Sequence, residues 1–180
     1  MNAPHPSPVP AADQTAGPRT PEEAGVWKLL EAVTDPEIPV LTVADLGVLR
    51  EVRVEAEAVE VVITPTYSGC PAMDTIESDI RVRLEAAGYA EVEVTTVLAP
   101  AWTTDWLSEA GRAKLAAFGI APPAEASGSK RALFGADPVV ACPHCGARDT
   151  ECVSQFGSTA CKAHYRCRAC LEPFDYFKCI

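Results

Sequence analysis

Four cysteines near the C-terminus have the spacing of a metal site. They form two Cys-x-x-Cys pairs, Cys142 with Cys145 and Cys167 with Cys170, and 21 residues separate the pairs. Each pair can turn tightly enough to present two thiolates to one ion, and two pairs complete a tetrahedral shell. The pattern predicts a four-cysteine, zinc-ribbon-like site. Zinc is the first expectation, but four thiolates also suit iron, as a rubredoxin-like centre or an iron–sulfur cluster.

Cysteine is concentrated in this part of the chain, since seven of the eight cysteines fall within residues 142–179. In a reducing cytosol such a cluster indicates metal binding rather than disulfides, and a module this small needs a metal to supply folding energy. Cys152, Cys161 and Cys179 are left without a partner in the pattern. They fit buried small hydrophobic residues. Alternatively, Cys161 and Cys179 approach the Cys-x-x-Cys pairs as alternative ligands or redox partners.

The eighth cysteine, Cys70, lies in a Gly-Cys-Pro sequence between an expected strand and an expected helix. If Pro71 is the first helical residue, Cys70 is the helix cap, beside unpaired backbone N–H groups and the positive end of the helix dipole. Both features lower the pKa of a thiol, and the thiolate is the form that binds metal or attacks a substrate. The competing interpretation is a buried, inert cysteine.

Few residues around Cys70 could support catalysis. Asp35, Glu37 and Asp45 are the acidic candidates, although Asp35 before a proline also favours a turn and Asp45 can brace a bend. Residues 20–138 contain no histidine that could activate Cys70 as a nucleophile. No phosphate-binding loop or dinucleotide fingerprint is present either. The chain is therefore not expected to be catalytic alone.

The residues that must position Cys70 have the pattern of a compact α/β (α+β) domain. Periodicity and turn signals predict helix 21–33, strands 48–54 and 59–63, a helix after Pro71 that stops at Gly88, strand 91–98, and a helix from Ser108 to Gly119 that buries Leu115 and Phe118. The predicted organisation is a disordered Pro-rich tail (1–20), this domain (21–120), a linker (121–138) and the ribbon module (139–180).

Charge and hydropathy exclude several classes of protein. The 180 residues carry a net charge of −10, which argues against nucleic-acid binding. Residues 22–121 hold 7 basic and 18 acidic residues, whereas residues 139–180 hold 5 and 4, so two modules of different electrostatic character are expected. No uncharged apolar run reaches the ~18 residues of a membrane helix, and the first residues do not form a secretory signal. We expect a cytoplasmic protein.

Several short motifs resemble known families. Asp35-Pro36-Glu37-Ile38-Pro39, residues 43–48, Thr64-Pro65 and Gly69-Cys70-Pro71 resemble the SufT-like family of cytosolic iron–sulfur assembly factors. The longer strings 64–72, 100–106, 156–163 and 172–179 are similar to the D-subunit family of bacterial phenylacetyl-CoA epoxidase systems. Together these motifs cover most of the chain apart from the tail and the linker.

The resemblance implies a role in aerobic phenylacetate degradation. In such systems a multicomponent di-iron monooxygenase epoxidises phenylacetyl-CoA, with electrons from NADPH delivered by a flavin and iron–sulfur reductase. This chain has no Glu-x-x-His pair of the kind used in di-iron sites. The assembly-factor motifs instead imply a maturation role, with Cys70, Asp35, Glu37 and Thr64 as functional positions and a transient iron or iron–sulfur cluster at Cys70. The family pattern also includes Cys161 and Cys179, but not Cys152.

Two hypotheses follow from the sequence. In the first, the chain is an accessory maturation factor that passes iron or a cluster to the oxygenase or reductase subunits. In the second, it is a structural coupling subunit that holds oxygenase and reductase together without metal transfer. The charge imbalance and three aromatic residues expected at the surface, Trp102, Trp106 and Phe177, motivate the second hypothesis. The sequence leaves the oligomeric state open, including a homo-oligomer.

Overall fold

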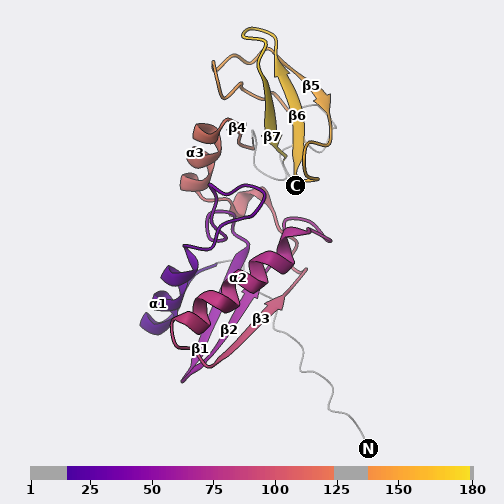
Figure 1. The fold of residues 1–180 in the computed structure, drawn as a ribbon. Coiled ribbons are helices and arrows are strands. Elements are labelled where there is room, and N and C mark those ends of the chain that lie inside the picture. Colours follow the sequence, from indigo (N-terminus) through magenta and orange to yellow (C-terminus); the bar gives the residue numbers. More distant parts are fainter. Residues whose placement is uncertain (1–15, 124–137, 179–180) are drawn as a thin grey trace, which may run out of the picture.

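The computed structural model describes residues 16–123 and 138–178 and has a mixed α+β fold with two sheets (Figure 1). The elements are α1 (Pro21–Leu30), β1 (Leu49–Glu55), β2 (Ala58–Ile63), α2 (Ala72–Ala86), β3 (Glu91–Thr96), the 3-10 turn η1 (Thr104–Trp106), α3 (Glu109–Phe118), β4 (Ile120–Ala121), β5 (Thr150–Ser154), β6 (Lys162–Cys167) and β7 (Pro173–Phe177). The predicted order of helix, strand, strand, helix, strand, helix is confirmed for the first domain. The fold class is therefore as expected from the sequence.

The first sheet has the strand order β1-β2-β3. β1 and β2 form an antiparallel hairpin, whereas β2 and β3 are parallel and connected through α2. A parallel pair requires a crossover connection, and α2 supplies it. α1 packs on β1 and on α2, and α2 packs on β3, so the two helices cover one face of the sheet (Figure 1). The loop that carries Cys70 leads from the end of β2 to the start of α2.

The helix ends largely follow the sequence signals. Thr20 and Glu23 form a capping box on α1, and the Ser108 side chain caps α3 by accepting a hydrogen bond from Gly111. α1 ends at Leu30, shorter than the predicted helix to residue 33. The expectation that Phe118 is buried was wrong, because 53% of it is exposed. It lies at the last position of α3, where the helical period no longer directs a side chain toward the core.

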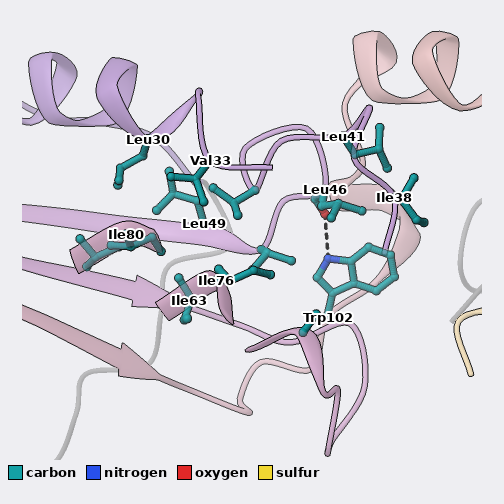
Figure 2. Close-up of a cluster of buried hydrophobic side chains, with 14 of the residues drawn as sticks. Leu30, Val33, Ile38, Leu41, Leu46, Leu49, Ile63, Ile76, Ile80 and Trp102 are labelled. Atoms are coloured by element: carbon teal, nitrogen blue, oxygen red, sulfur yellow. Dashed lines mark hydrogen bonds between the residues drawn. The ribbon is translucent and has the colours of Figure 1, made fainter. Parts of the chain in front are cut away.

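The hydrophobic core of the first domain lies between the sheet and its helices and extends to Trp102 (Figure 2). Trp102 is 4% exposed, and its indole Nε1 donates a hydrogen bond of 2.9 Å to the carbonyl oxygen of Leu46. Phe177 is 1% exposed. The expectation that Trp102 and Phe177 lie at the surface was therefore wrong. Both belong to one buried cluster, and only Trp106 of the three aromatic residues remains partly accessible.

The second sheet has the order β4-β7-β6-β5, with β5, β6 and β7 antiparallel and β4 parallel to β7. β4 follows directly on α3, so the chain already enters the second sheet at Ile120–Ala121, at the start of the expected linker. A small second core lies on this sheet, and it contains Ala121, Val140, Cys142, Ala163, Tyr165, Cys167, Phe174 and Tyr176. Its modest size is consistent with a module stabilised by metal.

The ribbon also packs against the first domain. Cys161 and Phe177, both from the ribbon, belong to the hydrophobic core of the first domain rather than to the ribbon core. The rings of Phe177 and Trp102 meet edge to face with centroids 6.0 Å apart. The backbone N–H of Lys178 donates to the Cys161 carbonyl oxygen at 3.0 Å, which joins the two ribbon segments. The two domains therefore share a buried contact.

Among the described residues, no helix has the length and apolar character that spanning a membrane requires.

Asp45, one of the acidic candidates, connects α3 to the loop before β1. Its Oδ2 accepts hydrogen bonds from the backbone N–H and the hydroxyl of Thr42 at 3.1 and 3.0 Å and pairs with Lys114 Nζ at 2.5 Å, while Oδ1 accepts from the Ser108 hydroxyl at 3.1 Å. Burial opposes ionisation of this carboxyl, but the bonds from Lys114 and Thr42 outweigh it and lower the pKa of Asp45. Asp45 therefore has a structural role.

Replacing Asp45 by asparagine is expected to lower the free energy of unfolding by about 1–3 kcal/mol at neutral pH, because the charged partner of Lys114 is lost. The pKa of Asp45 is lower in the folded protein than its ordinary value of 3.8. The ionised carboxylate therefore stabilises the fold fully above pH 3.8, and this contribution is lost as the pH falls through the pKa of the folded state. Urea unfolding at pH 7 and at successively lower pH measures this difference. Glu77→Gln, which breaks the exposed pair with Arg81, is a matched control with an expected effect below about 0.5 kcal/mol.

Candidate functional site

The four predicted metal ligands of the ribbon come together and are called the four-cysteine cluster below. Cys142 Sγ lies 3.7 Å from Cys170 Sγ, Cys145 Sγ lies 3.6 Å from Cys167 Sγ, and all four sulfurs lie within 4.8 Å of one another. Four sulfurs bonded to a central zinc ion at ~2.3 Å stand about 3.8 Å apart in a regular tetrahedron. The observed distances fit this geometry. The same set of thiolates also fits iron, so the structure supports a metal site without selecting the metal.

Backbone N–H groups donate hydrogen bonds to two thiols of the four-cysteine cluster. The N–H of Cys170 donates to Cys167 Sγ at 3.5 Å, and this bond is the main reason that the pKa of Cys167 is lowered to about 7. The backbone N–H of Glu172 donates to the Cys170 thiol and favours its thiolate form. Burial and hydrogen bonds with the neighbouring thiols have the larger combined effect and raise the pKa of Cys170 to about 12. Four thiolates cannot ionise side by side without a positive ion, so metal binding must displace protons.

Cys70 lies in the turn that precedes α2. Its backbone N–H donates to the Tyr67 carbonyl oxygen at 3.2 Å, and its own carbonyl accepts from Met73 at 3.3 Å. Pro71, not Cys70, is the cap residue of α2, so the expected cap position of Cys70 was wrong by one residue. The thiol still receives a hydrogen bond from the backbone N–H of Ala72, as expected at the start of a helix.

The expected lowering of the Cys70 pKa was also wrong. Burial is the largest effect and raises the pKa of the thiol, and the negative charges of Glu37 and Asp35 raise it further. Hydrogen bonds from the Ala72 N–H and from Tyr67 favour the thiolate, but together they do not offset burial and the two carboxylate charges. Cys70 is therefore a half-buried, protonated thiol at neutral pH, which is unlike an activated nucleophile.

The two acidic residues from the Asp-Pro-Glu motif have different positions. Asp35 is buried, and its Oδ1 accepts hydrogen bonds from the backbone N–H groups of Glu37 and Ile38, both at 2.8 Å, so it fixes the turn. Glu37 is only half-buried. Burial and then the Asp35 charge raise the pKa of Glu37, whereas Lys162 from the ribbon lowers it. Of the two carboxylates, Glu37 is the less buried and is therefore the better candidate for a ligand.

Thr64 directly follows β2, at the end of the hairpin, and lines a pocket. It is 1% exposed, and its Oγ1 finds no hydrogen-bond partner within the described residues. Thr64, Tyr67 and Trp102 line this pocket of about 220 Å³. Since Tyr67 also bonds to the Cys70 thiol, the pocket adjoins the cysteine. An unpaired hydroxyl in a buried position indicates a site that a polar group can complete.

Cys161 is buried, as the first of its two interpretations predicts, and the alternative that it approaches the Cys-x-x-Cys pairs is wrong. It does not join the four-cysteine cluster but lies in the core of the first domain, near Glu37 and Tyr67. Burial raises the pKa of the Cys161 thiol most, and the negative charge of Glu37 raises it further. The neighbouring Lys162, 5% exposed, contributes a positive charge to the same region and was not predicted. Cys179 lies outside the described residues. Cys152 packs against the ribbon core, consistent with an incidental cysteine.

Two family models match separate parts of the chain. Residues 23–97 match a model described as "Iron-sulfur cluster assembly protein", and residues 126–178 match "PaaD zinc beta ribbon domain". The first range includes Asp35, Glu37, Thr64 and Cys70, and the second includes Cys161 and all members of the four-cysteine cluster. The resemblances noted in the sequence are confirmed.

Individual relatives are similar to this chain over different lengths. An Escherichia coli K12 protein, provisionally named as the D component of 1,2-phenylacetyl-CoA epoxidase, is 48% identical over 160 residues, which cover 89% of this chain and 94% of the relative. An Fe-S protein maturation auxiliary factor of Porphyromonas gingivalis W83 is 39% identical and covers 48% of this chain and 84% of the relative. A crystal structure of a DUF59 domain from Bacillus anthracis is 29% identical, with a TM-score of 0.49, and covers 52% of this chain and 90% of that domain. By the extent and identity of the first match, this chain belongs to the D-component family of phenylacetyl-CoA epoxidase systems.

Proposed function

We propose that this chain is a cytoplasmic maturation factor for the metal centres of a phenylacetyl-CoA epoxidase system. In this proposal Cys70 transiently binds iron or an iron–sulfur cluster as cargo and delivers it to the oxygenase or to the iron–sulfur flavin reductase. The accessory role follows from membership of the D-component family. The maturation role is supported by the iron–sulfur assembly model over residues 23–97.

The observation that carries the proposal is the placement of Cys70. Its thiol lies at the start of a helix, half-buried, beside the carboxylates of Glu37 and Asp35, and the first domain contains no histidine to make it a nucleophile. A thiol and a carboxylate are ligands that suit iron(II). Because the pKa of Cys70 is raised, its thiol carries a proton, which a metal ion can displace. Such a site can bind cargo and release it again.

We assign a different role to the four-cysteine cluster. The proposal gives it a resident metal, with zinc first and iron second, that stabilises the ribbon. The closed arrangement of four thiols leaves no ligand position for exchange, as in structural zinc sites. The ribbon then serves to dock the partner subunits and to close one side of the Cys70 region.

The proposal predicts the metal content of the partners. Cells that express the oxygenase and reductase subunits with wild-type chain should yield fully loaded partners, whereas Cys70→Ser should reduce their iron by at least about tenfold relative to wild type. Cys152→Ser is the matched control, since it removes a half-buried cysteine outside the site. Iron and sulfide analysis of the purified partners measures the effect. Fully loaded partners from Cys70→Ser cells, with the variant itself folded, would contradict the proposal.

One observation favours the coupling role as a second candidate. The ribbon exposes four large apolar side chains, Val139, Val153, Phe156 and Leu171, at 43, 58, 68 and 69%. The coupling role requires such residues to form a contiguous apolar patch that a partner covers. A coupling subunit would form a stable complex with both partners and be insensitive to Cys70→Ser. Against the coupling role, Trp102 and Phe177 are buried. They are two of the three aromatic residues whose expected exposure motivates this role in the sequence analysis.

A further inference from the structure

The region of Cys70 contains a second thiol that comes from the other domain. We infer that Cys161 of the ribbon supplies a second thiolate to the cargo site of Cys70, so that both domains together bind one thiophilic divalent ion, with Glu37 as a third ligand. This inference rests on the proposed function, because it completes the same site.

Cys161 is positioned by the ribbon but buried in the first domain. It precedes β6, and its thiol lies 3.0 Å from the Thr159 hydroxyl, in a turn closed by the bond from Lys162 N–H to the Thr159 carbonyl at 3.2 Å. Its side chain, 5% exposed, belongs to the cluster against which Cys70 and Tyr67 pack. The adjoining contact of Phe177 with Trp102 holds this part of the ribbon on the first domain.

Contacts along the chain bring the two thiols toward one region. Cys161 is joined to Lys178 by a backbone hydrogen bond, and the neighbouring Phe177 ring meets Trp102. Trp102 and Tyr67 line the pocket beside Cys70.

The electrostatics agree with this placement. Glu37 and Asp35 raise the pKa of Cys70 and of Cys161, in each case after burial, and Tyr67 is influenced by the charges of both cysteines. Lys162 opposes this effect at Cys161 and pairs with Asp175 at 4.0 Å. Two thiols that share one half-buried carboxylate form a donor set of two sulfurs and one oxygen. This set suits iron(II), cobalt(II) or zinc(II).

The site differs from the four-cysteine cluster in a way that fits transient binding. Among the described residues, only the cysteines of that cluster form a group of three or more candidate ligands within 4.8 Å of one another. The ligands around Cys70 are therefore farther apart, and closing them on an ion requires movement of the Cys70 turn. Gly69, at φ +87°, gives this turn a backbone conformation that other residues rarely adopt. An open site binds more weakly than a closed one and can release its ion.

Cobalt(II) titration of the full, zinc-loaded chain under anaerobic conditions tests the inference. Cobalt binds thiolates more weakly than zinc, so it leaves the four-cysteine cluster intact, and its thiolate charge-transfer absorption reports sulfur ligands. Each thiol that releases a proton on binding makes the cobalt affinity rise about tenfold for each unit that the pH is raised. With two such thiols, the cobalt affinity of the wild type should rise about a hundredfold per pH unit. The cobalt affinity of Cys161→Ser should rise only about tenfold per pH unit, because one thiol is missing. This variant should also bind cobalt at least about tenfold more weakly and show less thiolate charge-transfer absorption. Cys152→Ser should behave as the wild type.

A second measurement needs no variant. Bound cobalt should slow the alkylation of Cys70 and of the buried Cys161 together, with Cys152 reacting as before, as read by mass spectrometry of each cysteine. Cys161 is followed over the longer times that local opening of a buried thiol requires. Protection of Cys70 alone, with a tenfold pH dependence in the wild type and unchanged binding by Cys161→Ser, would overturn the inference but leave the proposed function standing. If Cys70→Ser also binds cobalt as the wild type does, both the inference and the Cys70 site are wrong.

Discussion

Replacing Cys167 by serine is expected to unfold the ribbon while the first domain stays folded. Cys167 is fully buried at the end of β6, belongs to the ribbon core and has its sulfur 3.6 Å from that of Cys145. A structural metal on four thiolates contributes about 10–16 kcal/mol of apparent binding free energy, more than a core of eight residues can replace. Stripping the metal with a chelator should have the same effect on the wild type.

Amide hydrogen exchange in each of the two sheets tests this prediction directly. Amides of β6 and β7 should exchange rapidly in Cys167→Ser, whereas those of β1 and β2 should stay protected. Metal analysis should show the loss of one ion per chain. Cys152→Ser, in the adjacent strand, is the control and should retain both the metal and the protection. A Cys167→Ser variant with a protected ribbon sheet and one bound metal would show that the four-cysteine cluster does not hold the module together.

Replacing Trp102 by alanine is expected to destabilise the first domain by about 3–5 kcal/mol. The substitution removes a side chain that is 4% exposed, the hydrogen bond to Leu46 and the edge-to-face contact with Phe177. Trp102→Phe preserves an aromatic ring but leaves the Leu46 carbonyl without the indole donor, so we expect about 1–3 kcal/mol. Because Phe177 belongs to the ribbon, the alanine variant should also weaken the contact between the domains.

Urea unfolding followed by tyrosine and amide signals from each domain can check this result. The control is Phe118→Ala, since Phe118 is 53% exposed and should change the free energy of unfolding by no more than about 0.5 kcal/mol. A Trp102→Ala variant within about 1 kcal/mol of the wild type would mean that the aromatic contact is not part of a shared core.

Much of the first domain could be predicted from local signals. The Thr20 capping box, the Ser108 cap and the helical spacing of Ile76, Ile80 and Leu84 each act within a few residues, and the structure contains all of them. Phe118 was misplaced because it occupies the helix terminus, just before the αL residue Gly119. There the direction of the side chain depends on the neighbouring segment rather than on the helical period.

The meeting of the four cysteines in one cluster was also predictable, because their spacing within each pair fixes the local geometry. The surroundings of Cys70 were not. The position before a helix correctly indicated hydrogen bonds from backbone N–H groups, but burial and the two carboxylates from a distant loop outweigh them. Similarly, the burial of Lys162 and Phe177 and the place of Cys161 in the first-domain core depend on contact between two domains, and no local pattern encodes that contact.

The most direct test of the account is the transfer of iron from this chain to a partner. The chain, loaded anaerobically with isotopically labelled iron, is mixed with metal-free oxygenase and reductase subunits, and the label is measured in each after separation. The account predicts that label moves from the wild type and from Cys152→Ser, but that Cys70→Ser neither carries nor transfers it. Equal loading of the partners from Cys70→Ser, or from free iron alone, would contradict the claim that Cys70 carries the cargo.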